Sequence, residues 1–103
     1  MGTILNVTPD EVIRMQGDPT FRLVDVRDPS VYKRGHIPGS ISLPDYAIKD
    51  QCAVKLPDQD APIALYCQSG VHAMAAANQL IELGYTHVYF LGGIYEWPYG
   101  LER

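Results

Sequence analysis

The stretch IALYCQSGVHAMAAANQLIEL, residues 63–83, decides the fold. Its first five residues are apolar and end in Cys67, which is typical of a short buried strand, and a polar turn follows. From about Val71 to Leu83 the alanine-rich sequence predicts a helix, and Gly84 predicts its C-terminal cap. The stretch therefore predicts a strand, a tight turn and a helix, with a cysteine at the end of the strand.

Cys67 is a candidate nucleophile because of its position. Up to six successive backbone N–H groups, from Gln68 to Ala73, follow it, and the positive end of a helix dipole lies at the same turn. Both features favour the thiolate, which is the reactive form of cysteine. The alternative interpretation is that Cys67 only ends a buried strand, since unpaired cysteine is among the most buried residue types.

The composition indicates one soluble globular domain. The 103 residues can bury a core of their own and are too few for two domains. A net charge of -4 at pH 7 without a Lys/Arg-rich run argues against nucleic acid or an anionic membrane as a partner. The sequence has no run of ~20 apolar residues and no signal peptide, so we expect a cytoplasmic protein. A mature periplasmic chain would look similar.

Strands and helices alternate along the rest of the chain. This alternation predicts an α/β fold with a mainly parallel sheet covered on both faces, in which sites form at the carboxyl ends of strands. That geometry brings the Cys67 turn, residues 25–28 and Gly92–Gly93 to one edge of the sheet. The remaining predicted strands are Ile4–Leu5, Phe21–Val26, Ile41–Leu43 and Val88–Leu91, and the predicted helices are Pro9–Gln16, Pro29–Arg34 and, weakly, Tyr46–Lys49.

Four segments, in this order, resemble those of a single-domain rhodanese. They are Asp25-Val26-Arg27 with Tyr32, residues 35–40 (GHIPGS), the Cys67 turn, and residues 92–97 (GGIYEW). The resemblance spans Thr8 to Trp97, and it implies one rhodanese-like domain over residues 1–103. The implied fold has three layers, with helices on both faces of a mainly parallel sheet of about five strands.

The resemblance also implies a function. Rhodanese-like sulfurtransferases move sulfane sulfur from thiosulfate, or from a persulfide or polysulfide, to a thiol or cyanide. By this resemblance the sulfur would be held as a persulfide on Cys67, with no metal and no organic cofactor, and a sulfur-relay protein is a further candidate partner. The substrate-binding loop would consist of Gln68, Ser69, Gly70, Val71, His72 and Ala73.

Three more residues have two interpretations each. Asp25 and Arg27 either support the site electrostatically or form an ion pair that serves the structure alone. His36 is interpreted as a residue that holds its loop through hydrogen bonds rather than as a catalytic group.

The loop departs from the usual rhodanese pattern at His72 and Ala73. Many active rhodaneses carry Arg at the first of these positions, five residues after the cysteine, and Ser or Thr at the second. Arg offers a sulfonate a permanent charge and a bidentate fork, whereas an imidazole is only partly charged near neutral pH. A persulfide, polysulfide or protein donor therefore suits this loop better than thiosulfate does.

Two other classes of function stay open. His72 and Ala73 favour a non-catalytic rhodanese-like module that binds a protein or senses oxidants, whereas Cys67 and Gly70 favour the enzyme. A cysteine phosphatase or arsenate-reductase-like enzyme also uses a thiolate in a ring of N–H groups. It is disfavoured because such loops are longer and end in Arg, and here the first Arg after Cys67 is Arg103.

The loop sequence generates a first prediction. His72→Arg should raise turnover with thiosulfate more than turnover with a polysulfide, because only the sulfonate gains from a fixed guanidinium. Steady-state kinetics with both donors measure the difference. Equal effects on the two donors would contradict this account of His72.

Overall fold

A parallel sheet of five strands forms the middle layer of the fold. The computed structural model describes residues 2–103. The strand order is β1-β5-β4-β2-β3, and every neighbouring pair is parallel. The predicted α/β fold with a parallel sheet of about five strands is therefore confirmed. The strands are β1 (Ile4–Asn6), β2 (Arg22–Asp25), β3 (Ser40–Ser42), β4 (Ile63–Cys67) and β5 (Val88–Gly93).

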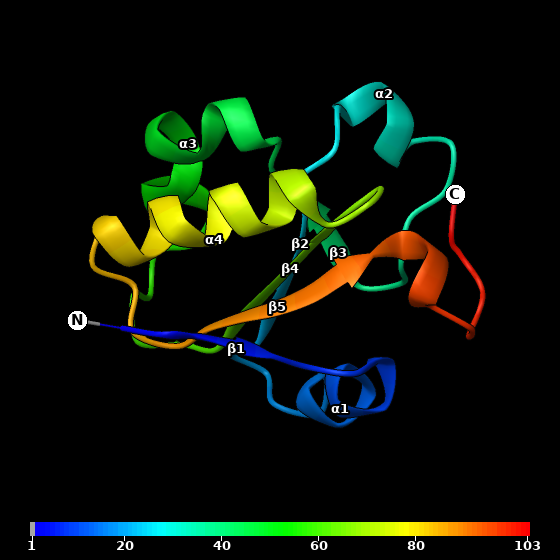
Figure 1. The fold of residues 1–103 in the computed structure, drawn as a ribbon, viewed down its shortest axis with the longest axis horizontal. Helices are drawn as coiled ribbons and strands as arrows, with labels where there is room; N and C mark the ends of the chain where they lie inside the picture. The colour runs from blue at the N-terminus through cyan, green and yellow to red at the C-terminus, as the bar shows by residue number, and fades with distance from the viewer. Residues whose placement is uncertain (1) are drawn as a thin grey trace.

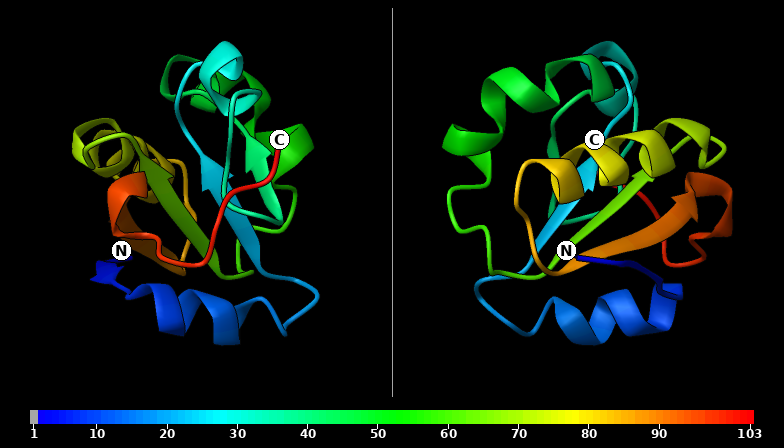
Figure 2. Two further views of the ribbon diagram at one scale, coloured as in Figure 1. Left: turned by 90° about the vertical axis from the view of Figure 1, so that its right-hand side faces the viewer. Right: turned by 60° about the vertical axis from the view of Figure 1, so that its left-hand side comes forward.

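Helices cover both faces of this sheet. α1 (Pro9–Met15) lies on one face, and α3 (Ile48–Lys55) and α4 (Val71–Glu82) lie on the other (Figure 1). Figure 2 shows the same three layers from two further sides. The short α2 (Pro29–Tyr32) follows β2, and the 3-10 turns η1 (Asp45–Ala47) and η2 (Ile94–Glu96) follow β3 and β5. In residues 2–103, no helix combines the length and the apolar character needed to cross a membrane.

β4 is the centre of the core. All five of its residues are buried, and they alternate between the two faces. Ile63, Leu65 and Cys67 pack in the cluster beneath α3 and α4, whereas Ala64 and Tyr66 pack in the cluster that includes α1 and η2. Burial on both faces is expected for the middle strand of a parallel sheet, and it explains why the sequence of β4 is continuously apolar.

The start of α1 agrees with the sequence prediction. Thr8 and Glu11 form a reciprocal capping box, in which Glu11 N donates to Thr8 Oγ1 at 3.2 Å and Thr8 N donates to Glu11 Oε1 at 2.9 Å. Pro9 occupies the first turn, where its missing N–H leaves no intrahelical hydrogen bond unmade.

The prediction around residues 46–55 was wrong in extent. The weak helix expected at Tyr46–Lys49 is the turn η1 followed by α3, which continues to Lys55. Ile48 and Cys52, one helical turn apart, are buried against the sheet. Tertiary burial of this narrow apolar face, rather than local sequence preference, stabilises the longer helix.

β5 contains an irregularity beside the end of β4. Leu65 pairs with Phe90, but Tyr66 pairs with Gly92 and Cys67 with Gly93, so the register shifts between Leu65 and Tyr66. The bulge places two glycines, rather than two side chains, next to the end of β4.

Tyr66 ties the loop before β3 to the centre of the sheet. Its buried hydroxyl accepts a hydrogen bond from Ile37 N at 3.0 Å and lies 3.0 Å from Ser40 Oγ. Burial, and then the nearby charge of Asp25, raise the pKa of Tyr66. The phenol therefore stays neutral at all ordinary pH values.

The hydrogen bond from Ile37 N to the Tyr66 hydroxyl predicts how much stability is lost when that hydroxyl is removed. Tyr66→Phe should lower the free energy of unfolding by about 1–3 kcal/mol, because the buried Ile37 N–H loses its acceptor. Urea denaturation measures the change. Tyr46→Phe is the matched control, since Tyr46 is exposed and should change the free energy by less than about 0.5 kcal/mol. Equal stabilities of the two variants would contradict the assigned role of Tyr66.

Candidate active site

Cys67 lies at the carboxyl end of β4, where the chain turns into α4. Its Sγ accepts hydrogen bonds from Gly70 N at 2.9 Å and from Ala73 N at 3.4 Å. The prediction of up to six N–H groups around the sulfur was therefore too large, since two of the six reach it. The amides of Val71 and His72 have no acceptor within residues 2–103, as expected in the first turn of a helix.

The residue as a whole is 1% exposed, yet it lines an open pocket. The pocket has a volume of about 590 Å³. Its walls come from five segments: the end of β2, the end of β4, α2 with the residues after it, the start of η1, and the first turn of α4. The lining residues are Val26, Arg27, Asp28, Val31, Arg34, Asp45, Tyr46, Cys67, Gln68 and His72.

Gly70 makes the turn between β4 and α4 possible. Its φ of 104° lies in the left-handed region, which glycine adopts readily and other residues rarely do. A Cβ at this position would lie 3.2 Å from Phe90 Cζ and 3.6 Å from the backbone of Gly92.

Arg27 and Asp25 form a buried ion pair. Arg27 Nη2 lies 2.6 Å from Asp25 Oδ2, and the two side chains are 8% and 0% exposed. Arg27 also donates to the carbonyl oxygen of Gly35 at 2.7 Å and to Gln68 Oε1 at 3.4 Å. Burial opposes the charge of Arg27, but the hydrogen bonds and the charge of Asp25 outweigh it and raise the pKa of the guanidinium. The geometry supports the structural interpretation of the pair, although Arg27 also borders the pocket.

His72 points to an acidic partner that the sequence prediction did not name. Its Nδ1 lies 2.8 Å from Asp45 Oδ2. The His72 side chain is 68% exposed and that of Asp45 is 30% exposed. When His72 is protonated, Asp45 therefore balances its charge at close range, so this position offers an anion less attraction than an unpaired cation would.

Several pocket residues were missed by the sequence prediction. Arg34, Asp45 and Tyr46 lie on segments outside the Cys67 loop, whereas Asp28 lies at the edge that the sequence predicted for residues 25–28. The place of Arg34, Asp45 and Tyr46 beside Cys67 depends on the order of strands β4, β2 and β3. Strand order is a tertiary property that hydrophobic periodicity does not encode.

His36 does not join Cys67. Its ring stacks on Tyr32 with centroids 3.8 Å apart, and its Nδ1 lies 2.9 Å from the Tyr32 carbonyl oxygen. Its Nε2 lies 3.4 Å from Glu102 Oε1. These contacts agree with the interpretation of His36 as a residue that holds its loop. In residues 2–103, no group of three or more His, Cys, Asp or Glu residues is arranged to hold a metal ion.

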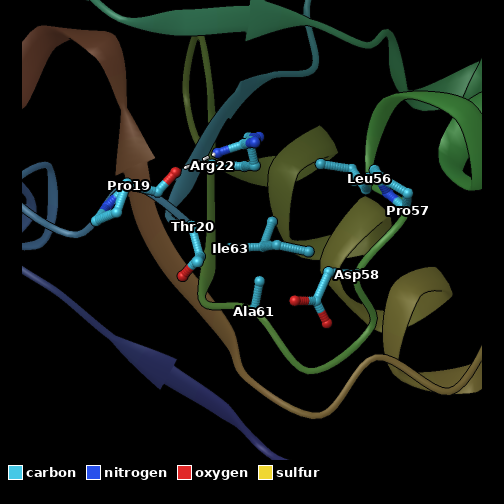
Figure 3. A pocket seen from close by; sticks show the side chains of 8 residues that line it. All are labelled: Pro19, Thr20, Arg22, Leu56, Pro57, Asp58, Ala61 and Ile63. Carbon is cyan, nitrogen blue, oxygen red and sulfur yellow. Dashed lines mark hydrogen bonds between the residues drawn. The ribbon is translucent and has the colours of Figure 1, made fainter.

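A smaller cavity lies at the opposite ends of the strands. It has a volume of about 140 Å³, and its lining includes Arg22 and Ile63, the first residues of β2 and β4. Figure 3 shows Arg22 turned toward Pro19, whose carbonyl oxygen accepts a hydrogen bond from Arg22 Nη1 at 3.0 Å. No nucleophilic cysteine lines this cavity. The candidate site is therefore the pocket that contains Cys67.

Comparison with known proteins shows which proteins this chain is similar to. The model of the rhodanese-like domain matches residues 8–98. Thiosulfate sulfurtransferase PspE of Escherichia coli (strain K12) is 37% identical over 71 residues, which cover 69% of this chain and 68% of that protein. Thiosulfate sulfurtransferase GlpE of Pseudomonas aeruginosa (strain PAO1) is 32% identical over 94 residues, which cover 91% and 83%. A solved structure of a rhodanese with anions from E. coli matches with a TM-score of 0.70 and 34% identity, over 74% of this chain and 89% of that one.

The turn at Gly70 predicts linked effects on stability and reactivity. Gly70→Ala should lower the free energy of unfolding by about 1–2 kcal/mol, because alanine is strained at this φ. It should also slow the alkylation of Cys67 by iodoacetamide at neutral pH, because the Gly70 N–H that stabilises the thiolate is displaced. A Cys52→Ala background leaves Cys67 as the single thiol.

Gly100→Ala is the matched control for that experiment. Gly100 also has a left-handed φ, 86°, but a Cβ there would meet nothing within 4 Å. This variant should lose stability and keep the parental alkylation rate. Equal alkylation rates for Gly70→Ala and its parent would show that the Gly70 N–H does not control the thiol.

Proposed function

The chain belongs to the rhodanese-like domain family, and from this premise we propose that it is a sulfurtransferase that carries sulfane sulfur as a persulfide on Cys67. The hydrogen bonds from Gly70 N and Ala73 N to Cys67 Sγ, at the wall of an open pocket, are the observation that supports this proposal most directly. Relatives named thiosulfate sulfurtransferase support the same reaction class.

The first step loads the sulfur. The Cys67 thiolate attacks the outer sulfur of the donor, a new S–S bond forms, and the donor's own bond to that sulfur breaks. With thiosulfate, the electron pair of the broken bond leaves with sulfite. With a polysulfide, it leaves with the shortened polysulfide. Cys67 then carries one extra sulfur atom, and the negative charge lies on that outer sulfur.

The second step discharges the sulfur. The thiolate of an acceptor attacks the outer sulfur, and the bond between that sulfur and Cys67 Sγ breaks. Its electron pair returns to Sγ, so the acceptor leaves as a persulfide and the Cys67 thiolate is regenerated. The N–H groups of Gly70 and Ala73 are already aimed at Sγ, and preformed donors stabilise developing charge without reorganisation. Cyanide would accept the sulfur in the same way and leave as thiocyanate.

We propose that a persulfide or polysulfide is the preferred donor and that thiosulfate is the weaker one. Thiosulfate brings two negative charges into a pocket that Asp28 and Asp45 also line. His72 faces Asp45, and the charge of Arg27 is matched by Asp25. Arg34 is the remaining cation that lines the pocket, and a singly charged donor, such as an alkyl persulfide or a hydropolysulfide anion, meets less repulsion from the two carboxylates than thiosulfate does. A sulfur-relay protein that presents a persulfide is a candidate partner for the same reason.

The proposal predicts a mass increase of one sulfur atom on Cys67. After incubation with inorganic polysulfide, intact-protein mass spectrometry should show this adduct, and peptide mapping should place it on Cys67. Incubation with thiosulfate should give a smaller fraction of adduct. Addition of a thiol acceptor should remove it, because the second step regenerates the free thiolate.

Two variants make that experiment specific. Cys67→Ser should form no adduct, whereas Cys52→Ala should load like the parent, since Cys52 is buried in α3 away from the pocket lining. Absence of an adduct with every donor would favour a non-catalytic binding module. Rapid Cys67-dependent hydrolysis of an aryl phosphate would instead favour the phosphatase class.

A further inference from the structure

We propose that a second hollow beside the Cys67 pocket binds the body of the acceptor, and that the preferred acceptor is a thiol that carries a carboxylate. The inference rests on the proposed function, because an acceptor has a role only if Cys67 carries sulfur. The hollow has a volume of about 320 Å³. It shares Arg27, Val31, Arg34 and Gln68 with the Cys67 pocket, so the two openings adjoin.

The two sides of the hollow differ in chemistry. Ile94, Tyr95 and Trp97, from η2 and the residue that follows it, supply an apolar and aromatic side, and Leu101 adds to it. Arg34 lies among the lining residues contributed by the segment after β2. A ligand with an apolar body and one anionic group would be complementary to both sides.

Charge distinguishes the hollow from the Cys67 pocket. Asp28 and Asp45 line the Cys67 pocket, whereas no Asp or Glu lines the hollow. Glu102, next in the chain to Leu101, faces His36 at 3.4 Å. A carboxylate would therefore meet less repulsion in the hollow than beside Cys67.

Arg34 is the cation available to that carboxylate. Its side chain is exposed, and it forms no ion pair with any residue in the range 2–103. Arg27 also borders the hollow, but its guanidinium is held by Asp25 and by the Gly35 carbonyl oxygen. A free guanidinium can bind a carboxylate in a bidentate fashion.

Gln68 connects the hollow with the reacting sulfur. It directly follows Cys67, and its side chain spans the boundary between the two openings. Gln68 Nε2 donates to Tyr95 Oη at 2.7 Å, and Gln68 Oε1 accepts from Arg27 Nη1 at 3.4 Å. An acceptor whose body lies in the hollow would thus extend its thiol past Gln68 toward the Cys67 persulfide.

Trp97 provides a direct test of binding, because it is the one tryptophan of the chain and lines the hollow. The probes are N-acetylcysteine, which has a carboxylate, and N-acetylcysteine amide, which lacks it, titrated into Cys67→Ser so that no sulfur is transferred. N-acetylcysteine should give a saturable change in Trp97 fluorescence, and Arg34→Gln should weaken its binding about threefold to fivefold, the upper part of the range for an exposed ion pair. The amide should be insensitive to Arg34.

Lys33→Gln is the matched control for Arg34→Gln. Lys33 is the neighbouring exposed cation and lines neither opening. Its replacement changes the net charge by the same amount and should leave both titrations unchanged. Equal weakening by the two variants would show that only the net charge matters and would overturn the assignment of Arg34.

Discharge of preloaded protein separates this inference from the proposed function. Protein loaded with polysulfide and freed of donor is mixed with either thiol, and loss of the sulfur adduct is followed by mass. Arg34→Gln should slow discharge to N-acetylcysteine about threefold to fivefold without slowing discharge to the amide. If no adduct forms at all, the proposed function fails. If the adduct forms but discharge to both thiols responds equally to Arg34→Gln, the acceptor site is overturned.

Discussion

The 2.9 Å hydrogen bond from Gly70 N to Cys67 Sγ is the contact on which the site depends. It exists because Gly70 takes a left-handed φ, which turns the chain from β4 directly into α4. The same turn brings Ala73 N, in the first turn of α4, to the sulfur. The thiol at the end of β4 thus accepts its hydrogen bonds from backbone N–H groups at the start of α4. No polar side chain is needed to orient these donors.

The buried pair of Asp25 and Arg27 has a different role. It connects β2, the Gly35 loop and Gln68 through one guanidinium. Removing one partner of such a pair would leave an unpaired buried charge, which is strongly destabilising. Because this charge is committed to the structure, the attraction of the site for anions depends on Arg34 at its rim.

The sequence was informative where local patterns determine structure, and less so where packing does. The apolar run of β4 and the turn after Cys67 were predicted correctly, and α1 begins at Pro9 as predicted. The length of α3 depends on burial against the sheet, so its sequence alone underestimated it. Asp45 and Arg34 both line the Cys67 pocket because β2 and β3 follow β4 in the order of the sheet, and the sequence does not show this order. The position of Cys67 and the family resemblance both indicated this residue as the candidate nucleophile, but neither could show that His72 faces Asp45.

The irregular pairing of β5 with β4 determines which positions around Cys67 tolerate substitution and which do not. Gly93 stands opposite Cys67, and a Cβ there would lie 2.7 Å from the Gln68 carbonyl oxygen. Main chain therefore fills the space behind the loop, while the side chains of Gln68 and His72 project into the open. Related proteins can therefore differ at the positions of Gln68 and His72, and so bind different sulfur-carrying partners, without a change in the backbone that surrounds the Cys67 thiol. The glycines at the bulge are the positions that such divergence has to leave alone.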